Sequence, residues 1–150
     1  MNRTQFSYNL LSGVALVVFL VIGFANLPDY GMGWDEVTRW ESGDKKIEYY
    51  LSVFDGGAEN KTQLMRGDRY PGLFDMTLGI LHRWVGGDRM LLGHGMSLLF
   101  GAIGLVATWW IAKTVFGNRS ALIALLLLAV YPSFYGHAMI NPKDIPFMTT

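Results

Sequence analysis

Two acidic positions in this sequence could supply a general base: the pair Asp35-Glu36 and the single residue Asp144. Each follows a long apolar stretch, so each carboxylate is expected at a membrane surface, charged and within reach of a lipid-borne substrate. A carboxylate placed there could take a proton from a hydroxyl group while the hydroxyl oxygen attacks a carbon atom. Asp35 is therefore the candidate catalytic base, and Glu36 is the second candidate catalytic residue.

The residues around these acids could bind a substrate. The carboxylate next to the base could orient it, bind a divalent cation, or raise its proton affinity by like-charge repulsion. Arg39 could meet a phosphate as a planar fork, and Lys143 could meet it as a point charge. The candidate substrate-binding residues are Arg39, His137, Asn141, Lys143 and Asp144. The three histidines do not have metal-ligand spacing, so no metal site is predicted.

The same residues also have a structural interpretation. Acids at a helix N-terminus are favoured by the helix dipole, and Asp35 and Arg39 have the i,i+4 spacing of a helical ion pair. Taken alone, Asp35-Glu36 is more typical of a solvated helix cap than of a catalytic base. His137 alone is more typical of a polar residue at the membrane interface. His94 lies inside an apolar stretch, where an ionisable group is a candidate functional residue.

Membrane helices are the elements that must position these acids. Apolar residues make up 51% of the 150-residue chain and gather in blocks at 10–27, 90–112 and 120–136. A helix needs roughly 17–25 residues to cross the hydrocarbon, and each block has that length. The sequence predicts an all-α, polytopic transmembrane protein with three full spans and the start of a fourth at Ile145–Met148. We expect residues 1–150 to be the N-terminal part of one longer transmembrane domain.

Basic residues in the short loops predict the orientation. Arg3 precedes the first block, while Lys113 and Arg119 lie in the link between the second and third. Because positive residues mark the cytoplasmic side, the N-terminus is expected in the cytoplasm and loop 28–89 on the outer face. The protein is expected to be a multi-pass protein of the cell (plasma or inner) membrane. A formal net charge of zero gives no basic surface for nucleic acid, so no nucleic-acid partner is expected.

The outer loop is expected to be helical. Asp35–Glu41 reads as a short helix that Gly43-Asp44 should interrupt, followed by a second helix with an apolar face. That face is formed by Ile47, Tyr50, Leu51 and Phe54. A polar loop is predicted at Ala58–Tyr70, and an amphipathic interfacial helix follows Pro71.

Two features of the spans concern helix packing. Gly93, Ser97 and Gly101 recur at four-residue spacing in the second block, which lets another helix approach closely in a membrane. Pro132 lies in the third block and is expected to loosen its outer turn.

Several short motifs have an order that is found in a known family. The outer loop carries Trp34-Asp35-Glu36-x-x-Arg39, and Tyr70-Pro71-Gly72-Leu73 precedes the interfacial helix. Later motifs are Ser97-Leu98-Leu99-Phe100-Gly101, Val115-Phe116-Gly117, Tyr131-Pro132-Ser133-Phe134 and Asn141-Pro142-Lys143-Asp144. In order and spacing, over nearly all 150 residues, the chain resembles the N-terminal part of GT-C membrane glycosyltransferases. The branch is that of protein O-mannosyltransferases and lipid A aminoarabinose transferases.

The resemblance implies an enzyme that moves a sugar from a polyprenyl-phosphate carrier to an acceptor protein or glycolipid on the outer face. It implies inversion at the anomeric carbon and no nucleotide sugar. It places the base on Asp35 with Glu36 beside it, and Asp144 in the same cavity. The implied partners are membrane lipid, the lipid-linked sugar and the acceptor; no cofactor is certain, and a divalent cation stays open. Gly72 and His94 depart from the family, in which a second proline and an arginine are common.

A non-enzymatic interpretation stays open. The chain could be a transporter or an accessory subunit whose outer loop binds a partner. Transporters place ionisable residues near the bilayer midplane on broken helices, whereas the acids of this chain gather beyond the ends of its apolar blocks. That distribution favours chemistry at the membrane surface.

Overall fold

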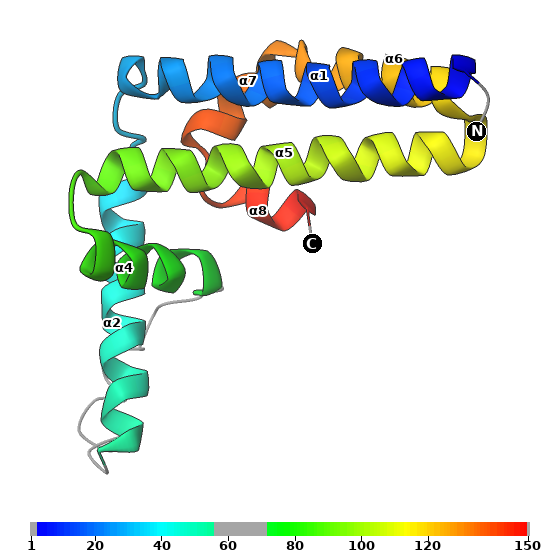
Figure 1. Ribbon diagram of the computed structural model, residues 1–150. Helices are drawn as coiled ribbons and strands as arrows, with labels where there is room; N and C mark the ends of the chain where they lie inside the picture. The colour runs from blue at the N-terminus through cyan, green and yellow to red at the C-terminus, as the bar shows by residue number, and fades with distance from the viewer. Residues whose placement is uncertain (1–2, 56–71, 150) are drawn as a thin grey trace. The chain divides into compact units, whose positions relative to one another are not determined.

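A computed structural model describes residues 3–55 and 72–149 (Figure 1). In these ranges every regular element is helical, which confirms the all-α class. The elements are α1 (Arg3–Asn26), the short 3-10 helix η1 (Leu27–Asp29), α2 (Glu36–Phe54), α4 (Leu73–Val85), α5 (Arg89–Phe116), α6 (Asn118–Ala129), α7 (Pro132–Ile140) and α8 (Asp144–Thr149). The predicted polar loop at Ala58–Tyr70 lies outside the described residues.

The chain forms two compact units. Unit 1 comprises residues 1–31 and 94–150, and unit 2 comprises residues 32–93. Each unit has contacts and a core of its own, and each is described separately below.

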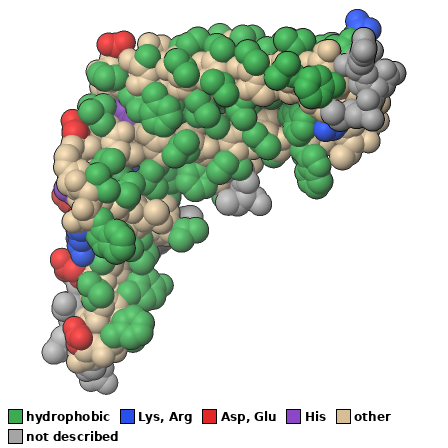
Figure 2. Space-filling model, viewed as in Figure 1, with side chains coloured by type: hydrophobic (Ala, Val, Ile, Leu, Met, Phe, Trp, Pro, Cys, Tyr) green, Lys and Arg blue, Asp and Glu red, His purple; other side chains and the backbone are tan. Residues whose placement is uncertain are grey.

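Two of the described helices are long and apolar enough to cross a membrane by length and composition: Gln5–Asp29 and Arg89–Phe116. Leu10, Val14, Val17 and Val21 recur along one face of α1, and each is more than half exposed. Figure 2 shows hydrophobic side chains spread over the surface of these long helices. An apolar face of this length is unfavourable in water and is what a lipid-facing helix presents. This chain is therefore a membrane protein, with helices at the first two of the predicted spans.

The third predicted span is not one helix. The sequence predicts a single element over 120–136, but α6 and α7 are separate helices bent by 65° relative to each other. Pro132 occupies the first turn of α7, where its missing N–H costs nothing, and Tyr131 before it is extended. Proline thus ends α6 rather than loosening a continuous turn. The pair makes a third span if it crosses as one bent unit, and a re-entrant loop otherwise.

Small residues bring the helices of unit 1 together. A Cβ atom at Gly101 of α5 would lie 2.8 Å from the Ala138 Cβ of α7. A Cβ at Gly23 of α1 would lie 2.6 Å from Leu98, which is fully buried. Gly101 belongs to the predicted stripe of small residues, and its role in close helix approach is confirmed.

We expect Gly101→Ala to lower the stability of unit 1. The new methyl group would meet the Ala138 Cβ, which cannot rotate away, so α5 and α7 must separate at a cost of about 1–3 kcal/mol. The loss should appear as a lower midpoint of thermal unfolding in detergent. Adding Ala138→Gly should restore most of it, because the methyl group then has space. Gly13→Ala on α1 is the matched control, since nothing lies within 4 Å of its Cβ position.

In unit 2, α2 packs on α4, and the predicted interruption at Gly43-Asp44 is wrong. The helix runs without a break from Glu36 to Phe54. A Cβ at Gly43 would lie 2.6 Å from the backbone carbonyl oxygen of Asp75, so glycine is present because α4 crosses close by. The helix ends at Phe54, with Asp55 as its C-cap.

The predicted apolar face of α2 is also only partly buried. Ile47 is buried and would contact a Cβ placed at Gly79 of α4. Tyr50, Leu51 and Phe54 remain more than half exposed. The spacing identified a real helix, but packing within unit 2 uses only the part of this face next to α4.

Candidate functional site

Asp35 and Glu36 lie at the start of α2 but in different surroundings. Asp35 is the N-cap residue and is half-buried, and its side chain makes no capping hydrogen bond. The backbone supplies the first-turn contacts instead, with the Arg39 N–H donating to the Asp35 carbonyl oxygen at 3.0 Å. Glu36, the next residue, is only 3% exposed. The Asp35 carboxylate is thus partly exposed and does not cap its helix. A general base needs such an accessible carboxylate to accept a proton from a substrate.

Arg39 lies one turn further along α2 and faces α4. Its Nη2 atom is 3.0 Å from Oδ2 of Asp75, and the two side chains are only 6% and 2% exposed. A buried ion pair of this kind is costly to break, because either charge left alone is poorly solvated. The contact joins α2 to α4 one turn after Asp35. Binding of a substrate phosphate by Arg39 stays a prediction.

A second ion pair joins α2 to Arg89, the first residue of α5. Both terminal nitrogens of Arg89 donate to the Asp44 carboxylate, Nη1 to Oδ2 at 2.7 Å and Nη2 to Oδ1 at 3.1 Å. The guanidinium also stacks on Trp40, with 5.6 Å to the ring centroid. A bidentate, stacked arginine gives strong geometric restraint, which lysine could not supply.

The residues predicted beyond the third span do come together. Oδ1 of Asn141 accepts the backbone N–H groups of Lys143 at 3.1 Å and Asp144 at 2.9 Å. Its Nδ2 donates to Oδ2 of Asp144 at 2.9 Å and lies 3.0 Å from Nδ1 of His137. Three of the candidate substrate-binding side chains, at 137, 141 and 144, therefore form one hydrogen-bonded cluster, which we call the Asn141 cluster.

The geometry of the Asn141 cluster favours one tautomer of the neutral His137 ring. Because two backbone N–H groups occupy Oδ1 of Asn141, the other amide atom can only be the donor nitrogen. Nδ1 of His137 must then accept, which puts the ring proton of neutral His137 on Nε2. His137, Lys143 and Asp144 are all exposed. The cluster can therefore offer an imidazole N–H and a carboxylate to a polar ligand, and the Lys143 ammonium group lies on the same exposed turn.

We expect Asn141→Ala to destabilise the turn between α7 and α8. The substitution removes an acceptor for two backbone N–H groups, which is comparable to losing a helix cap and costs about 1 kcal/mol. His137→Ala should cost less, since it leaves both backbone contacts in place. The measurement is the midpoint of thermal unfolding of the two variants side by side. Equal losses would show that the histidine contact, not the backbone capping, holds the turn.

The end of α1 carries a polar contact that the sequence did not suggest. The Asn26 amide donates to the Tyr135 hydroxyl at 3.1 Å, which links α1 to α7. Burial raises the pKa of the neighbouring Tyr30 hydroxyl, with Tyr135 and the Asp29 carboxylate adding to the effect. Tyr30 is therefore neutral at physiological pH and can act only as a hydrogen-bonding group.

Three further points concern the predicted site residues. Asp35 belongs to unit 2 and Asp144 to unit 1, so their sharing of one cavity stays a prediction. Within residues 3–55 and 72–149, no three His, Cys, Asp or Glu side chains gather as a metal site would require. His94, the ionisable residue inside the second apolar block, is buried, with 1% of its surface exposed, and a functional role for it stays a prediction.

No family model, curated protein or solved structure matches this chain. The resemblance to GT-C glycosyltransferases therefore depends on the order of short motifs alone.

Proposed function

We propose that residues 1–150 contribute the acceptor-activating part of a membrane glycosyltransferase that uses a polyprenyl-phosphate-linked sugar. The observation that carries the proposal is the place of Asp35. It lies six positions after the candidate span Gln5–Asp29, half-buried, with a carboxylate that its helix does not use for capping. A base at that depth can meet a reactive group that a lipid carrier holds at the membrane surface.

In the proposed reaction, Asp35 accepts the proton of an acceptor hydroxyl group. The hydroxyl oxygen forms a bond to the anomeric carbon of the sugar, and the bond from that carbon to the carrier phosphate breaks. The electron pair leaves with the polyprenyl phosphate, and the configuration at the anomeric carbon inverts. Lys143, beside Asp144, is the proposed partner for the leaving phosphate, where its positive charge offsets the charge that develops.

Two features of the site support this assignment. Asp35 stands on a turn braced by the buried Arg39–Asp75 pair, which gives the base a fixed position. The Asn141 cluster presents a hydrogen-bond donor and an acid on one exposed turn, and Lys143 on the same turn adds a cation, as a phosphate and a sugar hydroxyl would need. Both Asp35 and the Asn141 cluster are proposed to lie at the outer face of the cell membrane. The N-terminus is then in the cytoplasm.

A transfer assay tests the proposal. The complete reading frame that contains residues 1–150 would be purified in detergent and given radiolabelled sugars on a polyprenyl-phosphate carrier, with acceptor peptides or glycolipids. We expect labelled product without any nucleotide sugar. Transfer that requires a nucleotide sugar, or no transfer with any carrier-linked sugar, would argue against the proposal.

A second candidate function is transport. The 65° bend between α6 and α7 favours it, because transporters build substrate sites from discontinuous membrane helices. Uptake of a solute into proteoliposomes, with no group transfer, would favour this function over the first.

A further inference from the structure

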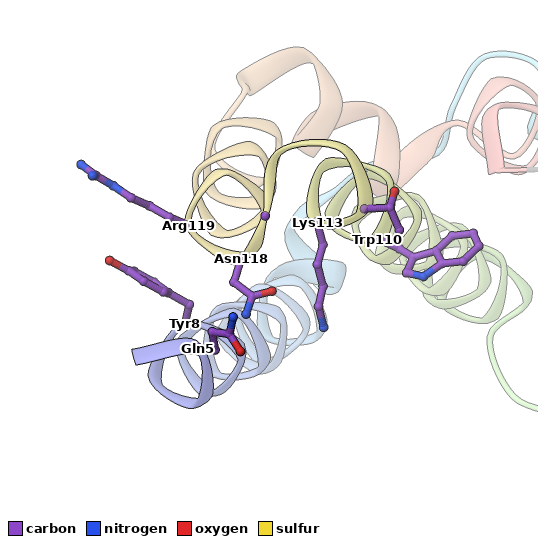
Figure 3. Close-up of a pocket in the computed structure, with 8 residues that line it drawn as sticks. Gln5, Tyr8, Trp110, Lys113, Asn118 and Arg119 are labelled. Carbon is purple, nitrogen blue, oxygen red and sulfur yellow. The ribbon is translucent and has the colours of Figure 1, made fainter. Parts of the chain in front are cut away.

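A cavity of about 520 Å³ lies in unit 1 where α1 begins, α5 ends and α6 begins (Figure 3). All of its lining residues belong to unit 1, so its geometry does not depend on unit 2. The volume lies within the range of pockets that hold small ligands. A tight turn shapes one wall: Gly117 joins α5 to α6 with φ 85°, a conformation that favours glycine.

The lining of the cavity is cationic. Of the described residues that line it, two are the cations Lys113 and Arg119 and none is an acid. Among the described residues neither cation forms an ion pair, and the Lys113 Nζ atom lies over the Trp109 ring at 4.3 Å. Gln5, Asn118 and Tyr8 add neutral hydrogen-bond donors to the same wall. In Figure 3 Lys113 extends from α5 toward Gln5 and Asn118, whereas Arg119 extends away with Tyr8.

The surroundings of the cavity are apolar. Trp110 lines it and is 63% exposed, and Ile111, Val115 and Phe116 on the last turns of α5 are also mostly exposed. These side chains belong to a helix of membrane-spanning length and composition. A ligand bound here would thus have its anionic part among the cations and an apolar part along the end of α5. Basic groups at the ends of membrane helices commonly bind lipid head groups in this way.

We propose that this cavity binds the phosphate head group of an anionic glycerophospholipid. Lys113 contacts the phosphate oxygens, and the Asn118 and Gln5 amides donate to the remaining head-group oxygens. Arg119, which is exposed and extends away from Lys113, adds positive charge near the head group, and the acyl chains lie along Ile111 and Val115. The site is separate from the proposed transfer reaction and does not depend on it. It would fix the depth of α1 and α5 in the leaflet that contains the N-terminus of α1.

Native mass spectrometry of the full-length protein in detergent tests this site. The probes are dioleoyl phosphatidylglycerol and dioleoyl phosphatidylcholine, which have the same acyl chains and differ in net charge. We expect at least tenfold tighter binding of phosphatidylglycerol. In Lys113→Gln/Arg119→Gln, phosphatidylglycerol binding should weaken about 30-fold. Each basic group near an anionic lipid contributes about a fivefold factor in affinity, and the two factors multiply. Equal binding of the two lipids by the unaltered protein would overturn the proposal.

The control removes the same net charge elsewhere. Lys45→Gln/Arg83→Gln alters two exposed basic residues of unit 2 and should leave phosphatidylglycerol binding within twofold. The charge-conserving variant Lys113→Arg/Arg119→Lys should bind nearly as well as the unaltered chain. If the control loses as much affinity as the cavity variant, binding is a general effect of charge and the site is wrong. Should the double variant not fold, Lys113→Gln alone, which removes the cation that extends toward Gln5 and Asn118, should still weaken binding severalfold.

A competition arm separates a lipid from a free anion. Inorganic phosphate and glycerophosphoglycerol carry the head-group chemistry without acyl chains. For a lipid site, millimolar concentrations of either should displace little phosphatidylglycerol. Displacement at micromolar concentrations would assign the cavity to a soluble phosphate compound and overturn the lipid assignment.

Discussion

Replacing Asp35 by asparagine is expected to reduce sugar transfer by the complete protein at least 100-fold. Asparagine keeps the size and polarity of the side chain but cannot accept the proton of the acceptor hydroxyl, and general-base catalysis contributes about 10²–10⁴ to such reactions. The fold should not change, because the Asp35 side chain makes no capping bond and the backbone contacts of the turn remain. The measurement is the rate of label transfer from a polyprenyl-phosphate sugar at saturating donor.

The matched control for this variant is Asp55→Asn. Asp55 lies at the opposite end of α2 and is exposed, so the same chemical change is made on the same helix. Transfer by that variant should stay within twofold of the unaltered protein. If Asp35→Asn retains full turnover, Asp35 is not the base, and Glu36→Gln becomes the next variant to measure. Equal loss in both variants would point to a general effect of charge at this helix.

Replacing Asp75 by asparagine is expected to destabilise unit 2 by about 3–5 kcal/mol. The substitution removes the carboxylate that lies 3.0 Å from the buried Arg39 guanidinium, and removing one partner of a buried ion pair costs this much. Circular dichroism of the full-length protein in detergent should show an earlier unfolding transition for the helices outside the spans. Since α2 carries Asp35, transfer should fall together with stability.

Two comparisons make this result specific. Glu41→Gln breaks the Glu41–Lys45 pair, which spans 4.0 Å with both side chains more than half exposed, and should cost less than about 0.5 kcal/mol. Arg39→Met combined with Asp75→Leu removes both buried charges and should recover most of the stability lost in Asp75→Asn. A cost for Asp75→Asn no larger than that of Glu41→Gln would show that the buried pair does not stabilise the helix crossing.

Local patterns in the sequence predicted the helices well. Uninterrupted apolar blocks predicted α1 and α5, since only a membrane stabilises such long apolar helices in isolation. The helix after Pro71 was also predicted, because proline acts on the backbone within a few residues. The spacing of Asn141 and Asp144 predicted that they belong to one functional region, and the structure places them in hydrogen-bonding contact.

Contacts between helices could not be predicted from the sequence. Gly43 looked like an interruption because glycine weakens an isolated helix, whereas in the structure it gives space to the backbone at Asp75. The i,i+4 spacing favoured Asp35 as the partner of Arg39, but the buried partner is Asp75, on a different helix. The bend at Pro132 depends on whether neighbouring helices can satisfy the backbone carbonyl that proline leaves without an N–H donor. The spacing of residues in the sequence does not reveal this.

The bend between α6 and α7 is anchored to α1 by aromatic rings. Phe19 of α1 contacts Phe134 and Tyr135 of α7, with ring centroids 6.3 and 5.9 Å apart, and the Asn26 amide bonds the Tyr135 hydroxyl. Any hinge motion that straightened the pair would have to detach all three of these contacts at once. These contacts oppose straightening of the corner, so they also restrain the position of the Asn141 turn, which follows α7, along the first helix.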